Sequence, residues 1–306
     1  MMHYRGRVFR PPFEENSLLI EATVGCSRDK CAFCSLYHDT PFSPSPMEDV
    51  ESDIRFIGRN RTLFKRVFLI GGDPFCLPYN RLCRIGELVG EHLPRVETIG
   101  CYASVRNILA KTPEQLADLA SLGYSGLNIG FETGLDDVLA FMDKGNTVDE
   151  AREALARLNE AGIPFTINLV TGLAGSGRGA ENALANAAIV NESQPQLIIV
   201  TALNVWPGTK LLDYVKAGKF TLPTLREIIL EEAAFLRATE CKDTLFFGMH
   251  ELNPVRVNGS LPEDRDYLAE ELEAGIARFP DDQLDMPLRQ INRQGVSVFG
   301  RTGRIS

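Results

Sequence analysis

Short hydrophobic stretches alternate with longer segments of helical periodicity along the first two thirds of the chain. The stretches are rich in β-branched residues and hydrophobic at nearly every position, which is typical of strands covered on both faces of a parallel sheet. Six of them occur, at residues 18–24, 67–70, 96–103, 127–131, 165–170 and 197–203. This alternation predicts an α/β protein built from successive βα units.

The intervening segments carry helix start signals. A Ser or Thr stands three residues before a Glu or Gln, the capping-box pattern, at Ser45, Thr112, Thr147 and Thr224. After Thr147 hydrophobic residues recur at helical spacing, and Gly162 stands where a left-handed C-cap belongs. We expect amphipathic helices that pack against the sheet.

Six βα units form either an open doubly wound sheet or a barrel, complete or partial. No G-x-G-x-x-G follows the first predicted strand, which disfavours a dinucleotide-binding Rossmann domain. In both architectures functional groups gather at the carboxyl ends of the strands. The polar and glycine residues after the predicted strands are therefore the first candidates for a site.

Charge and composition exclude several classes of protein. The net charge is -9 and the pI about 5.1, so the average field repels a polyanion and a nucleic-acid substrate is disfavoured. No hydrophobic run approaches the ~20 residues that span a bilayer, and the first residues lack the hydrophobic core of a signal peptide. Seven cysteines in a chain of 306 residues are unlike a short disulfide scaffold. We expect a cytoplasmic protein with reduced thiols.

Three of those cysteines are clustered after the first predicted strand. Cys26, Cys31 and Cys34 form a C-x4-C-x2-C pattern. Three thiolates bind zinc when a fourth protein ligand closes the tetrahedron, and His38 is the nearest candidate. They equally suit a [4Fe-4S] cluster in which one iron stays open to a ligand outside the protein. Phe33, inside the motif, either shields such a group or packs beside a bound ligand.

The second strand is followed by Gly71, Gly72 and Asp73. Two residues without a Cβ allow the backbone to approach a ligand closely, and the Asp73 carboxylate accepts hydrogen bonds from an ammonium group. An isolated Gly-Gly pair is usually a turn. Its place after a strand, in the same protein as the cysteine motif, favours a binding role.

These features occur in an order that resembles the radical S-adenosylmethionine (SAM) superfamily, in particular its Elp3-like, MiaB-like and HemN-like catalytic cores. The matching segments, after the cysteine motif, are "GGDP", "GFETGLDDVLAFMDKGNT", "AGIPFTINLVTGLAGS" and "PGTKL". The spacing between the first two cysteines is one residue longer than in the commonest motif of the family, which indicates a separate branch.

The resemblance implies a partial (β/α)6 TIM-like barrel over residues 17–215, after an N-terminal arm over 1–16. A C-terminal helical extension over 216–306, with helices after Thr224 and Pro262, would close the barrel. It also implies a [4Fe-4S] cluster and SAM as cofactors, a small-molecule substrate, and an external flavodoxin-like or ferredoxin-like electron donor. Reductive cleavage of SAM would give a 5′-deoxyadenosyl radical that abstracts hydrogen from the substrate.

Site residues are carried over from the family position by position. Cys26, Cys31 and Cys34 would hold the cluster, with Phe33 beside it. The residues that would bind SAM are Gly71, Gly72 and Asp73 at the methionine amino group; Ser104, Arg106, Glu132 and Thr133 at the carboxylate or ribose; and Asn168, Val170, Leu203, Asn204 and Val205 along the ribose and adenine.

Two other functions stay open. One is a [4Fe-4S] protein for electron transfer or sensing that does not cleave SAM. The other is a tRNA-modifying radical SAM enzyme, which the acidity and the lack of an appended basic domain disfavour. Cys76 and Cys101 lie near the ends of predicted strands, and we expect them to be small buried hydrophobic side chains. We expect His250 to make a structural hydrogen bond, and none of these three residues is assigned a functional role.

Overall fold

The computed structural model describes residues 2–59, 63–287 and 296–299 and separates into two compact units. The first comprises Met1–Asp29, Leu36–Gly130 and Glu153–Phe165. The second comprises Lys30–Ser35, Phe131–Arg152 and Thr166–Ser306. The domain boundaries drawn from the sequence stay a prediction, and each unit is described separately.

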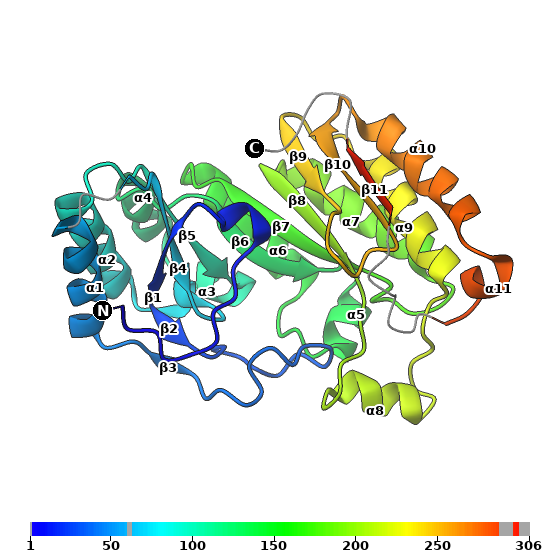
Figure 1. Ribbon diagram of the computed structural model, residues 1–306, viewed down its shortest axis with the longest axis horizontal. Coiled ribbons are helices and arrows are strands. Elements are labelled where there is room, and N and C mark those ends of the chain that lie inside the picture. Colours follow the sequence, from blue (N-terminus) through cyan, green and yellow to red (C-terminus); the bar gives the residue numbers. More distant parts are fainter. Residues whose placement is uncertain (1, 60–62, 288–295, 300–306) are drawn as a thin grey trace. The chain divides into compact units, whose positions relative to one another are not determined.

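Parallel strands form the core of the first unit (Figure 1). They are, in spatial order, β1 (Leu18–Glu21), β4 (Arg66–Ile70), β5 (Thr98–Ala103) and the start of β6 (Leu127–Glu132). Ile20 pairs with Leu69 and Leu69 with Cys101, and all three side chains are buried. The near-continuous hydrophobicity of these strands thus reflects burial on both faces, as the sequence predicts.

The first hydrophobic stretch is not one strand. β1 ends at Glu21, and Thr23–Val24 form a separate strand, β2, which pairs antiparallel with β3 (Ser43–Pro44). The chain therefore leaves the sheet before the cysteine motif begins.

Helices cover the sheet of the first unit. They are α1 (Met47–Arg59), α2 (Tyr79–His92), α3 (Val105–Leu109) and α4 (Pro113–Ser121), with 3₁₀ turns at η1 (Pro12–Glu14) and η2 (Pro74–Cys76). α2 packs on both α1 and α4. α6 (Val148–Glu160) begins in the residues of the second unit and ends in those of the first.

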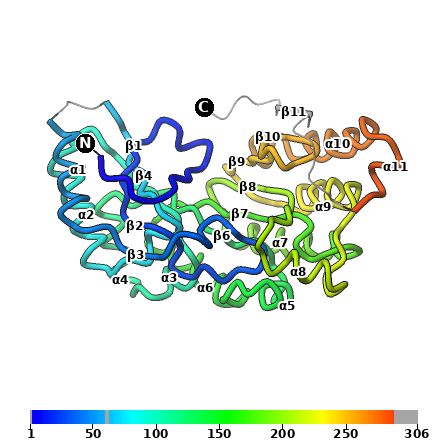
Figure 2. The backbone as a smooth tube through the Cα atoms, turned by 60° about the horizontal axis from the view of Figure 1, so that its bottom comes forward, coloured from blue at the N-terminus to red at the C-terminus, as the bar shows by residue number. Residues whose placement is uncertain are grey.

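The second unit is also built on a sheet. β7 (Phe165–Thr171), β8 (Leu197–Ala202) and β9 (Thr244–Phe247) are parallel, β10 (Val255–Leu261) runs antiparallel to β9, and β11 (Val296–Phe299) runs parallel to β10. Its helices are α5 (Asp136–Phe141), α7 (Gly179–Ser193), α8 (Lys210–Lys216), α9 (Leu225–Ala238), α10 (Arg265–Gly275), η3 (Ile276–Arg278) and α11 (Asp281–Leu284). α9 packs on α7 and α10, and α10 packs on β10 (Figure 2). Within the described ranges, every helix is too short or too polar to cross a membrane.

The α/β fold class is confirmed: the strands are mostly parallel, helices flank them and the sheet does not close, as in a partial barrel. All six stretches contain strands. Residues 216–306 contain the helices expected from Thr224 and Pro262, but also β9, β10 and β11, which the hydrophobic pattern did not predict.

Three of the four capping boxes are confirmed. The hydroxyls of Thr112, Thr147 and Thr224 accept from the backbone N–H three residues later, at 3.2 Å each. Gly162 has a φ of +68°, as expected of a C-cap. The cap predicted at Ser45 is not confirmed, because α1 begins at Met47, two residues later, and Pro46 directly precedes it; the Ser45 hydroxyl donates to Glu21 at 3.2 Å.

Candidate active site

The end of β4 lies directly against the first cysteine. The Gly72 N–H donates to the Gly25 carbonyl at 2.8 Å. A Cβ on Gly72 would lie 2.8 Å from both Cα and Cβ of Cys26, and a Cβ on Gly71 would lie 2.0 Å from Thr23 Oγ1. Gly71 also has a φ of +132°, which favours glycine. Both glycines are therefore required because two segments of the first unit touch here.

Asp73 follows this contact as a buried carboxylate. Only 4% of the residue is exposed. Its Oδ2 accepts from Ser27 Oγ at 3.0 Å and from Asn107 Nδ2, whereas its Oδ1 has no hydrogen-bond partner among the residues that the structure describes. Burial raises the pKa of Asp73, and the neighbouring polar side chains of Ser104, Ser27 and Asn107 oppose that rise. A buried acceptor atom without a donor is a costly arrangement that a cationic or N–H ligand would relieve.

The residues after β5 orient this carboxylate. Ser104 is the N-cap of α3, where its Oγ accepts from the Asn107 N–H at 3.4 Å. The Asn107 amide thereby reaches Asp73. Arg106, on the same helix, is exposed. Sequence reasoning missed Ser27 and Asn107, although each lies within a few residues of a predicted site residue.

Two further cysteines of the first unit, Cys76 and Cys101, sense the charge of Asp73, which raises the pKa of each thiol. Burial raises the pKa of Cys76 to about 12, and the Asp73 charge adds to the effect. Cys101 is fully buried in β5, and burial raises its pKa further. A raised pKa favours the neutral thiol in both, and Cys101 is the small buried side chain that was expected, whereas Cys76 is partly exposed.

The second and third cysteines lie on a short segment, 30–35, that belongs to the second unit. The Ala32 N–H donates to the Met142 carbonyl and the Ala32 carbonyl accepts from the Leu211 N–H, both at 2.8 Å. The Cys34 N–H donates to the Cys31 carbonyl at 3.2 Å, which closes a turn. The backbone around Cys31 and Cys34 is thus fixed to the connection between α5 and α6 and to the start of α8.

A buried ion pair stands beside these two cysteines. Lys144 Nζ lies 2.7 Å from Glu132 Oε1, and the two side chains are 13% and 12% exposed. Burial alone lowers the pKa of Lys144, but the charges of Glu132, Cys31 and Cys34 outweigh it and raise that pKa. Glu132 has a φ of +75°, uncommon for a residue with a side chain. Sequence reasoning singled out Glu132 but missed Lys144, whose signal was its place in the "MDKG" segment.

Thr133, next to Glu132, has its side chain fully buried in the protein. Its hydroxyl donates to Asn182 Oδ1, whose amide nitrogen donates to Glu231 Oε1 at 2.7 Å. Glu231 Oε2 accepts from the Gly172 N–H at 2.9 Å, and burial raises the pKa of Glu231 to about 8. This network ties the end of β6 to the end of β7.

The remaining predicted site residues lie in the second unit, along β7 and after β8, except for Phe33, which lies between Cys31 and Cys34. Asn168 and Val170 are on one face of β7, and both are partly exposed between buried neighbours. Leu203 is buried and its N–H donates to the Thr171 carbonyl at 2.9 Å. The other three predicted residues, Phe33, Asn204 and Val205, are partly exposed.

The two histidines that the sequence singled out have ordinary partners. His38 Nε2 lies 3.7 Å from Asp29 Oδ1. His250 Nδ1 accepts from the Leu252 N–H at 3.2 Å, and burial lowers the pKa of His250. The expected structural hydrogen bond of His250 is confirmed.

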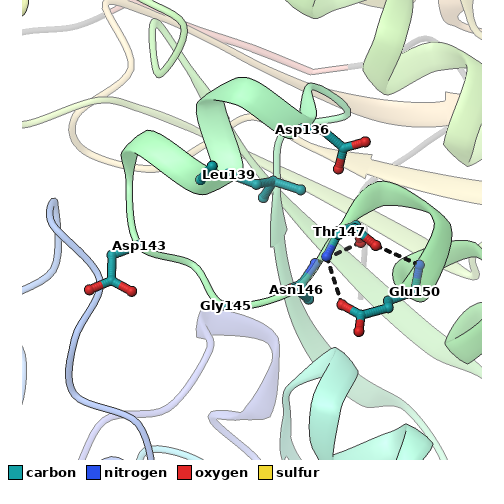
Figure 3. A pocket seen from close by; sticks show the side chains of 8 residues that line it. Asp136, Leu139, Asp143, Gly145, Asn146, Thr147 and Glu150 are labelled. Atoms are coloured by element: carbon teal, nitrogen blue, oxygen red, sulfur yellow. Dashed lines mark hydrogen bonds between the residues drawn. The ribbon is translucent and has the colours of Figure 1, made fainter.

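A surface hollow of about 580 Å³ lies along the connection between α5 and α6 (Figure 3). Asp136, Thr147 and Glu150 line it, and their polar atoms already serve the start of α6. Asp136 Oδ1 accepts from the Val148 N–H at 2.7 Å, and Glu150 Oε2 accepts from the Thr147 N–H at 2.8 Å. The hollow contains none of the residues predicted to bind a cofactor.

The donors fit a cluster by their chemistry. Cys26, Cys31 and Cys34 are partly exposed and in no disulfide, and the buried cation of Lys144 lies close enough to Cys31 and Cys34 to sense them. Within the described ranges, no three His, Cys, Asp or Glu side chains are already gathered around a metal position. The fit therefore rests on the donor set and on the Asp73 acceptor rather than on a preassembled geometry.

Comparisons with known proteins give the class. Residues 20–177, just over half of the chain, match the Radical SAM superfamily. The chain therefore belongs to this superfamily. It is an enzyme, and its cofactors are a [4Fe-4S] cluster and SAM, which define the family.

Individual relatives are distant. The radical SAM methyltransferase TsrM from Kitasatospora setae, solved with tryptophan and a SAM analogue, aligns with TM-score 0.55 and 18% identity over 73% of this chain and 44% of its own. Methylornithine synthase (PylB) aligns with TM-score 0.54 and 18% identity over 92% of this chain and 78% of its own. A tRNA uridine(34) acetyltransferase from Methanocaldococcus jannaschii is 22% identical over 108 residues. Those residues are 35% of this chain but only a fifth of that enzyme, so its activity does not transfer as a whole.

Replacing Gly72 by Ala should reduce cluster loading, because the new Cβ would collide with the backbone of Cys26. We expect Gly72→Ala to hold less than half of the wild-type iron after anaerobic reconstitution, measured by iron analysis and absorbance. Gly90→Ala in α2 is the matched control, since its Cβ would meet nothing within 4 Å. Equal iron in the two variants would contradict the contact.

Proposed function

We propose that the protein uses Cys26, Cys31 and Cys34 to hold one [4Fe-4S] cluster and cleaves SAM reductively to abstract hydrogen from a small-molecule substrate. The observation that carries this proposal is Oδ1 of Asp73, which is buried next to the segment of Cys26 and has no hydrogen-bond partner within the described part of the chain. The methionine amino group of SAM is an ammonium donor that such an atom accepts. When bound, the cluster supplies the electron that cleaves the sulfonium.

The chain's own residues bind and orient the cofactor. Asp73 holds the amino group, and Ser27 and Asn107 fix the carboxylate so that Oδ1 stays directed at it. Glu132 and Lys144 offer one anion and one cation for the ribose hydroxyls and the methionine carboxylate. Asn168, Val170, Asn204 and Val205 line the strand ends that would face the nucleoside.

A buried hydrogen-bond network holds the end of β6, which carries Glu132, in place. Thr133, which we assigned to the ribose or carboxylate, acts through Asn182 and Glu231 to fix the strand ends on either side of it. We therefore assign the Thr133 side chain a positioning role, and propose that Glu132 contacts SAM directly.

An RNA substrate has one observation in its favour, the similarity to a tRNA-modifying acetyltransferase over 108 residues. The net charge of -9 opposes it, because non-specific RNA affinity depends on cationic contacts to phosphate. A cluster protein that does not cleave SAM is opposed by Asp73, whose arrangement has no use in electron transfer alone. We therefore favour a small molecule as the substrate.

Removing the three proposed ligands should abolish the cluster. Wild-type protein should bind about four irons and, with dithionite, convert SAM to 5′-deoxyadenosine. Cys26→Ala/Cys31→Ala/Cys34→Ala should lose the iron and all product, measured by iron analysis and chromatography. Cys83→Ala, which removes a partly exposed thiol of α2, should behave as wild type. Iron retained by the triple variant would refute the ligand assignment.

Neutralising Asp73 should weaken SAM binding without loss of iron. A hydrogen bond to a charged group contributes about 1.5–3 kcal/mol, so Asp73→Asn should lower the affinity about tenfold or more. Calorimetry on cluster-loaded protein measures this, with the exposed Asp149→Asn as the control of equal charge change. Equal affinities for SAM in Asp73→Asn and wild type would remove Asp73 from the site.

A further inference from the structure

Lys144 is a buried cation beside residues 30–35, the cysteine segment. It follows Met142 by two residues, and the Met142 carbonyl holds the Ala32 N–H at 2.8 Å between the two cysteines of the segment. Its ammonium is 2.7 Å from Glu132 Oε1 and mostly shielded from water. The connection between α5 and α6 therefore places the positive charge of Lys144 beside the backbone of Cys31 and Cys34. The negative charge of Glu132, at the end of β6, lies next to it.

The other charges on this connection are placed differently. Asp143 Oδ2 lies 3.1 Å from Lys210 Nζ, and those side chains are 40% and 54% exposed. Lys210 also donates to the Lys30 carbonyl at 3.4 Å. The exposed pair of Asp143 and Lys210 thus holds the first residue of the cysteine segment. Water and salt screen exposed charges strongly and buried charges weakly. A group held by Cys31 and Cys34 would thus sense the buried charges of Lys144, on this connection, and Glu132, at the end of β6, more strongly than the exposed charges of Asp143 and Lys210.

A cluster bound by three thiolates carries net negative charge and gains one more upon reduction. A nearby buried cation stabilises the reduced state more than the oxidised state, and a nearby buried anion does the opposite. The potentials of iron–sulfur clusters are set in part by such charges around them.

We propose that Lys144 raises the reduction potential of the cluster and that Glu132 limits the rise, so that this ion pair sets how readily the cluster accepts its electron. This role rests on the proposed ligands Cys31 and Cys34 and is separate from any contact that either residue makes with SAM. The two residues act on the same group with opposite sign.

The test is a redox titration of cluster-loaded protein without SAM, followed by electron paramagnetic resonance. In Lys144→Met the cation is lost and Glu132 remains unneutralised, so we expect the equilibrium constant for one-electron reduction to fall about tenfold, which is about 59 mV. Glu132→Gln should shift the midpoint to higher potential. Lys144→Arg keeps the charge and should stay near the wild-type value.

Lys242→Met is the matched control. It removes one positive charge from an exposed residue of the same unit that precedes β9, and should leave the midpoint unchanged. Opposite shifts in Lys144→Met and Glu132→Gln support the proposal. Shifts of the same sign, or none in either variant at wild-type iron content, overturn it.

If Lys144→Met fails to load iron, the signs of Glu132→Gln and Lys144→Arg decide: a midpoint raised in the former and unchanged in the latter supports the proposal, and any other pair of results overturns it. The outcome does not depend on SAM cleavage. Failure of the ligand assignment would show separately, as iron retained when Cys31 and Cys34 are replaced.

Discussion

The contact between Gly72 and the backbone of Cys26 is the constraint on which the first half of the site depends. Because neither Gly71 nor Gly72 has room for a Cβ, the end of β4 and the start of the cysteine motif are fixed against each other. This contact sets the position of Asp73, one residue further on. Ser27, which follows Cys26, then reaches the Asp73 carboxylate at 3.0 Å. The glycine pair thus links a proposed cluster ligand to a proposed SAM ligand within one unit.

In the second unit, buried polar groups are used in the same way. Burying a charge is costly unless it is paired, and Lys144 and Glu132 satisfy each other beside the segment of Cys31 and Cys34. The network of Thr133, Asn182 and Glu231 holds the chain after Glu132. Glu132 therefore keeps its unusual backbone conformation because both its side chain and its neighbour are fixed.

The sequence predicted the parts of this protein that depend on local patterns. Strands buried on both faces are hydrophobic throughout, and a Thr three residues before Glu caps a helix through its own hydroxyl, as at Thr224. β10 was missed because it places polar Arg256, Asn258 and Ser260 among its hydrophobic residues, whereas the prediction relied on continuous hydrophobic stretches. Ser45 had the capping pattern, but α1 begins two residues later, at Met47, and the Ser45 hydroxyl donates to Glu21, a residue distant in sequence.

The residues of the candidate site also fall into two groups, those that local sequence patterns predict and those that depend on the fold. The cysteines and glycines could be predicted from the sequence because the spacing of three thiols and the lack of a Cβ are local features, and Asp73 directly follows the glycines. The partners Ser27, Asn107 and Lys144 depend on which loops the fold brings together, and one sequence does not state this. The burial of Thr133 is of the same kind, since it arises from α7 and α9.

The central claim, one iron of a cubane held open for SAM, is tested most directly by Mössbauer spectroscopy of protein reconstituted with ⁵⁷Fe. On saturation with SAM, about a quarter of the iron signal should move to a new doublet with a larger isomer shift, because one iron gains nitrogen and oxygen ligands. A spectrum unchanged by SAM, with all four irons equivalent, would contradict the account.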